Sequence, residues 1–215
     1  RNSGINTLMK TPHFIDGNRI TLLRNGAEYF PALEAAIDGA REEVHFETYI
    51  FEHDATGIRI AAALKRAARR NVAVHLLLDG FGSHDLPRAV IQDMLDAGVQ
   101  VIMYGQKISP FGLQRQRLRR MHRKLVVVDA AIAFVGGLNI IDDLHNPEPL
   151  PPRYDYAVAV EGPLLTEIHP AARHLWKLLA WAHFNRRWVS RLKLHPTGEP
   201  HPYGSQRAAF VMRDN

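Results

Sequence analysis

Short apolar runs alternate with amphipathic segments along most of this 215-residue chain. Runs of Ile, Val and Leu with the length of a buried strand are followed by segments with apolar residues at helical spacing. Such alternation is typical of an α/β domain. The predicted strands are 20–23, 44–51, 72–78, 99–104, 125–128, 132–135 and 156–160, and the predicted helices are 27–40, 58–68, 86–97 and 164–188, with Pro170 as a candidate interruption. We therefore expect an α/β fold in which a mixed β-sheet is sandwiched between helical layers.

A dense polar pattern occurs where two of these strands adjoin. In MHRKLVVVDAAIAFVGGLN, six residues have the spacing His-x-Lys-x4-Asp-x6-Gly-Gly-x-Asn, namely His122, Lys124, Asp129, Gly136, Gly137 and Asn139. A neutral imidazole can attack phosphorus and carry the transferred group, while an amine and an amide hold the anionic oxygens. By chance, this set would occur in roughly one in a hundred thousand sequences of this length. The pattern indicates phosphoryl transfer, for which we expect no metal and no cofactor.

Strand geometry suggests a role for most of the motif. His122 and Lys124 are two residues apart at the start of a strand, so their side chains should leave the same face and contact one phosphate. Gly136 and Gly137 end the next strand, and their missing side chains would let the backbone approach an oxyanion. Asn139 would donate to the same anion from the following turn.

Each of these residues also has a common structural explanation when it is taken alone. His-x-Lys often lies on a solvated strand edge, a Gly-Gly pair often forms a turn, and Asp after a strand often orders a turn. Asp129 belongs to the motif and is kept as a candidate catalytic residue, although its place at a strand end favours ordering the turn. The combination at fixed spacing, rather than any one residue, predicts the site.

The motif and its surroundings resemble the phospholipase D superfamily, and within it the bacterial cardiolipin synthases. The matching segments are LLRNGAEYFPALEAAIDGA, VHFETYIFEHDATG, NVAVHLLLDGFGS, RRMHRKLVVVD, FVGGLN and YDYAVAVEGP. The resemblance extends from Thr21 to Trp181 and implies a phospholipase D-like fold. It also implies transfer of a phosphatidyl group through a phosphohistidine on His122, from phosphatidylglycerol or a similar lipid to a second lipid, which makes cardiolipin.

The resemblance further implies an acidic residue that orients the histidine. Asp155, in YDYAVAVEGP, has the matching position and is the candidate acceptor for the second ring nitrogen of His122. Glu148, Asp142 and Asp143 are near enough in sequence to stay as alternatives.

Enzymes of this superfamily generally combine two such motifs, but no other histidine of this sequence is followed two positions later by lysine. The tail after HPTGEPHPYGS ends in AAFVM, which resembles the first strand of a second half. We therefore expect an N-terminal extension at 1–18, the first half of a catalytic domain at 19–190, and a linker with the start of a missing second half at 191–215. The alternative is a homodimer in which each chain supplies one His122.

Charge predicts an anionic partner. The net charge is +5 and the pI is near 9.7. The basic and partly apolar loop 105–120, which leads into the motif, suits docking on an anionic membrane, with a solvated charge run as the alternative. Arg120 and Arg123, on either side of His122, are predicted to contact the substrate.

Other polar residues are assigned structural roles. Asp79, His84 and Asp85, in DGFGSHD, are predicted to order a turn and cap a helix rather than to bind a metal, and no histidine pair has the His-Glu-x-x-His spacing. Glu47 and Tyr49 either line the site or have a structural role at the end of their strand, which we favour.

The sequence contains no cysteine, which excludes disulfides and a thiolate nucleophile. No stretch has the length and apolarity of a membrane span. The resemblance implies peripheral association with the bacterial cell membrane, on its cytoplasmic face.

Two alternative functions are a phosphodiesterase or nuclease of the same superfamily, acting as a dimer, and a non-catalytic lipid-binding half domain. Nucleic acid is the less favoured substrate, because the segments before the motif resemble synthases.

Overall fold

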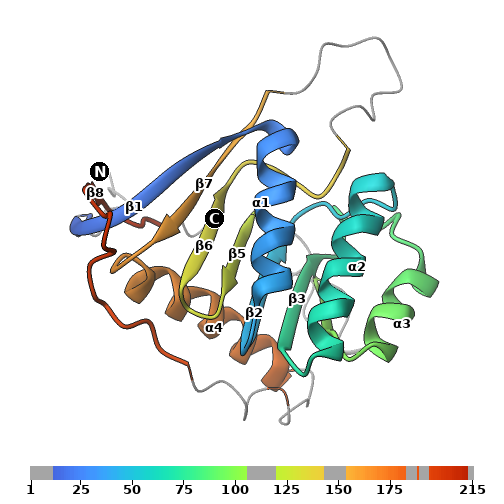
Figure 1. Cartoon of the computed structure of the whole chain (residues 1–215). Helices are drawn as coiled ribbons and strands as arrows, with labels where there is room; N and C mark the ends of the chain where they lie inside the picture. The colour runs from blue at the N-terminus through green and yellow to red at the C-terminus, as the bar shows by residue number, and fades with distance from the viewer. Residues whose placement is uncertain (1–11, 106–119, 143–153, 183–187, 189–193, 213–215) are drawn as a thin grey trace, which may run out of the picture.

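The computed structural model of the chain describes residues 12–105, 120–142, 154–182, 188 and 194–212. These residues form one mixed β-sheet and four α-helices (Figure 1). The strands are β1 (Ile15–Arg24), β2 (Glu43–Thr48), β3 (Ala73–Asp79), β4 (Gln100–Tyr104), β5 (Leu125–Val128), β6 (Ile132–Gly136), β7 (Tyr156–Glu161) and β8 (Gln206–Ala208), and the helices are α1 (Asn25–Gly39), α2 (Ala55–Arg69), α3 (Arg88–Asp96) and α4 (Leu165–Ala182).

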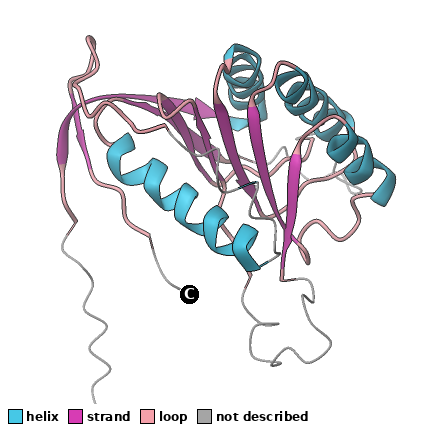
Figure 2. Ribbon diagram, turned by 90° about the horizontal axis from the view of Figure 1, so that it is seen from below, coloured by secondary structure: helices cyan, strands magenta, loops and turns pink. Residues whose placement is uncertain are grey.

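The sheet has the strand order β4-β3-β2-β5-β6-β7-β1-β8. Strands β2, β3 and β4 are parallel to one another, and the other neighbouring pairs are antiparallel. Helices α2 and α3 connect the parallel strands, since such strands need a crossover connection. Helices α1, α2 and α3 cover one face of the sheet and α4 covers the other (Figure 2). The prediction of a mixed sheet between helical layers is confirmed.

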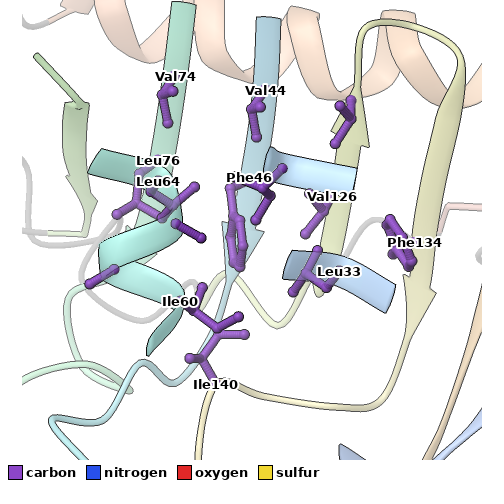
Figure 3. Close-up of a cluster of buried hydrophobic side chains, with 14 of the residues drawn as sticks. Leu33, Val44, Phe46, Ile60, Leu64, Val74, Leu76, Val126, Phe134 and Ile140 are labelled. Atoms are coloured by element: carbon purple, nitrogen blue, oxygen red, sulfur yellow. The ribbon is translucent and has the colours of Figure 1, made fainter. Parts of the chain in front are cut away.

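The larger core lies between the sheet and the layer of α1, α2 and α3 (Figure 3). Alternate residues of the strands point into it, as expected for strands that are covered on both faces. Its buried side chains include Leu33, Ile60 and Leu64 from the helices and Val44, Phe46, Val74, Leu76, Val126 and Phe134 from the strands. Burial of each large apolar side chain contributes about 1.5–3 kcal/mol to the free energy of folding. The packed core therefore holds the strands, and the residues at their ends, in fixed positions.

Strand β1 begins at Ile15, earlier than the predicted start at residue 20. The predicted boundary between an extension and the domain, after residue 18, therefore falls inside this strand. Asn18 explains the difference, because it is fully buried although it is polar. Its side chain donates to the carbonyl of Ile15 at 2.7 Å and accepts from the amide of Leu164 at 2.8 Å. A buried asparagine that satisfies neighbouring backbone groups breaks the apolar pattern by which a strand is predicted.

The C-terminal tail adds to the same sheet. Strand β8 pairs with β1, and the rest of the segment AAFVM forms no strand in the part that the structure describes. Of this segment, Ala208 belongs to β8, and both Ala208 and Phe210 pack against the apolar cluster under α4. Helix α4 continues through Pro170, so the predicted interruption there is wrong. Pro170 lies in the second turn, where the missing amide removes one helical hydrogen bond. Among the described helices, none has the length and apolarity to cross a membrane.

Candidate active site

Most of the predicted site residues lie at one end of the sheet. Strand β5 begins directly after Lys124, and β6 ends at Gly136. The strand register places Leu125 opposite Glu47 of β2, and Gly136 opposite Ala157 of β7. Four segments therefore meet at one end of the sheet: the end of β2, the segment before β5, the end of β6 and the start of β7.

His122 and Lys124 form a compact pair at this edge. The Nζ atom of Lys124 is 3.1 Å from Nε2 and 3.3 Å from Nδ1 of His122. His122 is exposed, whereas Lys124 is buried. Burial lowers the pKa of Lys124, and the charge of Asp155 opposes this shift. An anion that reaches the imidazole from solvent would thus meet the amine as well, as the spacing predicts.

Tyr49, just beyond β2, contacts both members of this pair. Its ring centroid is 5.0 Å from that of His122, and the Lys124 Nζ is 5.3 Å from the same Tyr49 centroid. The amine is thus within cation–π distance of the ring. The sequence pattern favoured a structural role for Tyr49 at the end of its strand. In the structure, its ring lines the candidate site beside His122 and Lys124.

Asn139 lies next to this part of the site. Its side-chain oxygen accepts a hydrogen bond from the amide of Ile50, the residue after Tyr49, at 3.2 Å. This bond uses the oxygen, so the side-chain NH2 is the donor that Asn139 could offer an anion. Within the described residues, no hydrogen bond joins Asn139 to His122 or Lys124.

Asp79 fixes the segment that leads into His122. Its Oδ2 accepts from the amide of Met121 at 2.7 Å, and its Oδ1 accepts from the amides of Phe81 and Gly82 at 3.0 Å each. The predicted turn role is confirmed by the two local bonds. The bond to Met121 was not predicted, because it joins residues that are 42 positions apart. An acidic residue at the end of a buried strand is the one sequence signal that could have suggested it.

His84 and Asp85 take no part in the site. Both are exposed, and they contact each other at 3.2 Å. Helix α3 begins after Pro87 and has no side-chain cap, so the predicted capping role of Asp85 is wrong.

The two motif glycines allow close strand packing rather than an approach to an anion. A Cβ on Gly136 would lie 2.5 Å from the Cα of Ala157, and one on Gly137 would lie 2.2 Å from the Oδ1 of Asp155. Their amides are occupied as well, since that of Gly136 donates to the carbonyl of Lys124 at 3.4 Å and that of Gly137 to the carbonyl of Tyr156 at 3.0 Å. The prediction that these glycines let the backbone approach an oxyanion is therefore corrected. Their missing side chains allow β7 to pack closely against β6.

Asp155 is placed beside the site by this packing. Its charge acts on Lys124, as noted above. Its Oδ1 accepts from the amide of Tyr156 at 2.8 Å, and no bond to His122 occurs among the described residues. The predicted acceptor for the histidine is therefore, in this structure, an electrostatic partner of the lysine. Of the alternatives, Glu148 and Asp143 lie outside the described residues, whereas the Asp142 amide bonds to Asp54 at 2.7 Å.

Asp129 lies at the opposite end of β5 from His122. Its carboxylate accepts from three consecutive amides, those of Arg41, Glu42 and Glu43, at 2.8–2.9 Å. Five residues separate it from Lys124, which is about 17 Å along a strand. The prediction that Asp129 is a catalytic residue is therefore corrected. Asp129 orders the turn, which is the role that its position at a strand end favoured.

The two predicted substrate-binding arginines have protein partners. The Nε atom of Arg123 is 2.9 Å from Oε2 of Glu47. Burial raises the pKa of Glu47 to about 7, with the Arg123 charge opposing the shift. Arg123 and Glu47 are therefore structural partners of each other.

Arg120 is exposed, and its guanidinium carbon lies 3.3 Å from the ring centroid of Phe81. It is thus held near the site, on a ring that is itself exposed. The basic loop predicted to dock on a membrane lies outside the described residues between 106 and 119.

Comparison with known proteins identifies the family and the fold. The family model described as cardiolipin synthase, phospholipase D-like domain, matches residues 33–147, more than half of the chain. Cardiolipin synthase B of Shigella flexneri is 38% identical over 200 residues, which cover 93% of this chain and 47% of that protein. The chain thus spans about half the length of the curated relatives that it matches.

Two solved structures share the fold. NucT from Helicobacter pylori has a TM-score of 0.56 and 21% identity, over 79% of this chain and 98% of that one. Nuc from Salmonella typhimurium, a phospholipase D family member, has a TM-score of 0.51 and 18% identity, over 84% and 99%. With the family match, the His122–Lys124 pair and this fold, the chain belongs to the cardiolipin synthase family of phospholipase D-like domains.

Proposed function

We propose that this chain carries one half of a phosphatidyltransferase site that makes cardiolipin, with His122 as the nucleophile. The observation that carries the proposal is the contact of the Lys124 amine with the exposed His122 imidazole. A nucleophile that is open to a lipid headgroup, with a cation at its side, suits a phosphodiester that is negatively charged before and during the reaction. The match to the cardiolipin synthase family supports this substrate class.

In the first step, a ring nitrogen of His122 attacks the phosphorus of one phosphatidylglycerol. The bond from phosphorus to the glycerol headgroup breaks, and the departing glycerol oxygen takes a proton from an acid on the far side. In the second step, a hydroxyl of another phosphatidylglycerol gives up its proton to the group that acted as the acid and attacks the phosphohistidine, and the bond from phosphorus to His122 breaks. Cardiolipin forms and His122 is restored. Lys124 and Asn139 stabilise the phosphoryl oxygens in both steps, and Asp155 keeps the lysine charged.

The acid in this scheme is a second histidine from another copy of the motif. The chain has one His-x-Lys pair and spans about half the length of its matched relatives, which supports this division. The second copy is supplied either by a further part of the same polypeptide or by a second chain in a homodimer. The +5 net charge supports anionic phospholipids and a peripheral membrane surface as partners.

The proposal is tested by incubating the protein with phosphatidylglycerol vesicles and, separately, with plasmid DNA. We expect cardiolipin and free glycerol in equal amounts, and no DNA cleavage. Phosphatidic acid in place of cardiolipin would mean that water is the acceptor. DNA cleavage without lipid turnover would identify a nuclease and reject the synthase. Binding to vesicles without any product would favour a lipid-binding module, and the mass in solution would then show whether a dimer had formed.

Substitution of Asp79 tests whether the segment before His122 has to be fixed. In Asp79→Asn, the side-chain NH2 replaces one acceptor oxygen, so at least one of three backbone amides loses its partner. An unpaired buried amide costs about 1–3 kcal/mol of unfolding free energy, and we expect cardiolipin formation to fall about tenfold through kcat. The control is Asp85→Asn, at an exposed residue of the same loop. Its unfolding free energy and its kcat should equal those of the wild type. Equal kcat in Asp79→Asn would show that this anchor does not position His122.

A further inference from the structure

A second polar cluster lies inside the protein, under helix α4. It consists of Glu43 and His45 from β2 and His169 from α4, which we call the Glu-His-His cluster. The exposed fractions of these residues are 3%, 2% and 0%. Glu43 is the first residue of β2, whereas His122 lies beyond the other end of that strand. The cluster is therefore separate from the candidate active site.

The three side chains converge. One potential ligand atom from each lies within 4.8 Å of the other two. Oε1 of Glu43 is 2.6 Å from Nε2 of His169, and Oε2 of the same carboxylate is 3.7 Å from Nε2 of His45. The ligand atoms of a tetrahedral zinc ion are about 3.4 Å apart. One of the two separations is shorter and the other longer than this value, and each involves a different oxygen of Glu43, so the side chains would have to adjust for one ion to contact all three residues.

Several ring nitrogens of the cluster have no hydrogen-bond partner within the described residues. Both nitrogens of His45 and the Nδ1 of His169 are buried in this way. A buried polar atom without a partner costs about 1–3 kcal/mol, so the imidazole of His45, with both nitrogens unsatisfied beside the Glu43 carboxylate, needs an explanation.

We propose that the Glu-His-His cluster binds a divalent transition-metal ion of the zinc type, which ties α4 to β2. Two imidazoles and one carboxylate are a donor set that suits zinc. The ion would replace the direct contact between Glu43 and His169 and give one of the two unsatisfied nitrogens of His45 a partner. A water molecule would take the fourth position of a tetrahedral ion. Because its three protein ligands are buried, the ion would have a structural role.

The surroundings bear on which ion fits. His75 stacks on His45 with a centroid distance of 4.6 Å, and its Nδ1 bonds to Gln100 at 2.9 Å. The positive charge of Arg173 also acts on His45 and His75. A nearby cation weakens the binding of any metal, so bonding to the imidazole nitrogens has to supply the affinity. Imidazole favours Zn²⁺, Co²⁺ and Ni²⁺ over Mg²⁺ and Ca²⁺.

The test uses Co²⁺ as a spectroscopic probe on the tag-free full chain. The protein is unfolded with a chelator, freed of metal and refolded with one equivalent of Co²⁺. We expect the visible absorption of four-coordinate Co²⁺, its loss when Zn²⁺ is added, and a Tm that Zn²⁺ raises by about 5 °C or more when it is present well above its Kd. Mg²⁺ should give no such rise.

Two histidines of α4 provide matched variants. His169→Gln should lose the Co²⁺ absorption and the Zn²⁺-dependent rise in Tm, and circular dichroism checks that it is folded. His174→Gln, an exposed position on the same helix, should keep both. The wild-type measurement decides the question even if His169→Gln does not fold. Absence of Co²⁺ absorption in the refolded wild type would overturn the proposal, and so would a signal that His174→Gln removes, because the metal would then sit on a surface histidine.

Discussion

His122→Ala should reduce cardiolipin formation from phosphatidylglycerol by at least about a thousandfold, because removal of a nucleophile leaves only binding and electrostatic contributions. The fold should persist. His122 is exposed, and exposed substitutions typically change the unfolding free energy by no more than about 0.5 kcal/mol. The measurement is the initial rate of cardiolipin formation, together with a denaturant titration of each protein.

The matched control is His84→Ala, which removes an exposed histidine outside the site. Its rate should equal that of the wild type. A second readout is covalent labelling with a phospholipid that carries radioactive phosphorus, which should mark the wild type and His84→Ala but not His122→Ala. Retention of more than about a tenth of the wild-type rate by a folded His122→Ala would refute the nucleophile assignment.

The second large effect is expected for Gly137→Ala, at a residue for which we propose no contact with substrate. A new Cβ would lie 2.2 Å from Oδ1 and 2.7 Å from Cγ of Asp155. The aspartate, the backbone or both must then move. Displacement of a site group by about 1 Å can cost about a hundredfold in rate, and overpacking typically costs about 1–3 kcal/mol in stability. We therefore expect about a hundredfold loss of cardiolipin formation in a protein that remains folded.

Gly39→Ala is the matched control, because a Cβ at that position would meet no atom within 4 Å. Gly39 is the last residue of α1, and alanine there should leave the rate unchanged and add up to about 1 kcal/mol of stability. If Gly137→Ala matched the wild type in rate, the position of Asp155 beside Lys124 would have no catalytic importance.

Local patterns were sufficient to predict the four helices and every described strand except β8. Strand β3, with the sequence AVHLLLD, is covered on both faces, so its near-continuous apolar run is easy to recognise, whereas β2, EVHFET, alternates polar and apolar residues. The adjacency of His122 and Lys124 followed from the two-residue period of an extended chain. Both predictions concern residues that are close in sequence, where geometry is fixed by the backbone.

The errors in the site have a common physical origin in contacts between distant segments. Asp155 faces Gly137 because β7 packs directly on β6, and no pattern in either strand specifies that approach. Arg123 was assigned to the substrate because of its charge, but its partner, Glu47, is on another strand. The bond between Glu43 and His169 joins residues 126 positions apart. A single sequence contains no signal for such pairs unless they belong to a known motif.

The position of β1 has a consequence for biosynthesis. This strand is near the start of the chain, yet both of its neighbours in the sheet, β7 and β8, come near the end. The side chain of Asn18 donates to the carbonyl of Gln206, which is 188 positions further on. At a translation rate of about 5–20 residues per second, the ribosome needs roughly ten seconds or more to supply those neighbours. During that time the nascent strand has open hydrogen-bonding edges, so we expect the emerging polypeptide to rely on chaperones until residues 156–208 have been made.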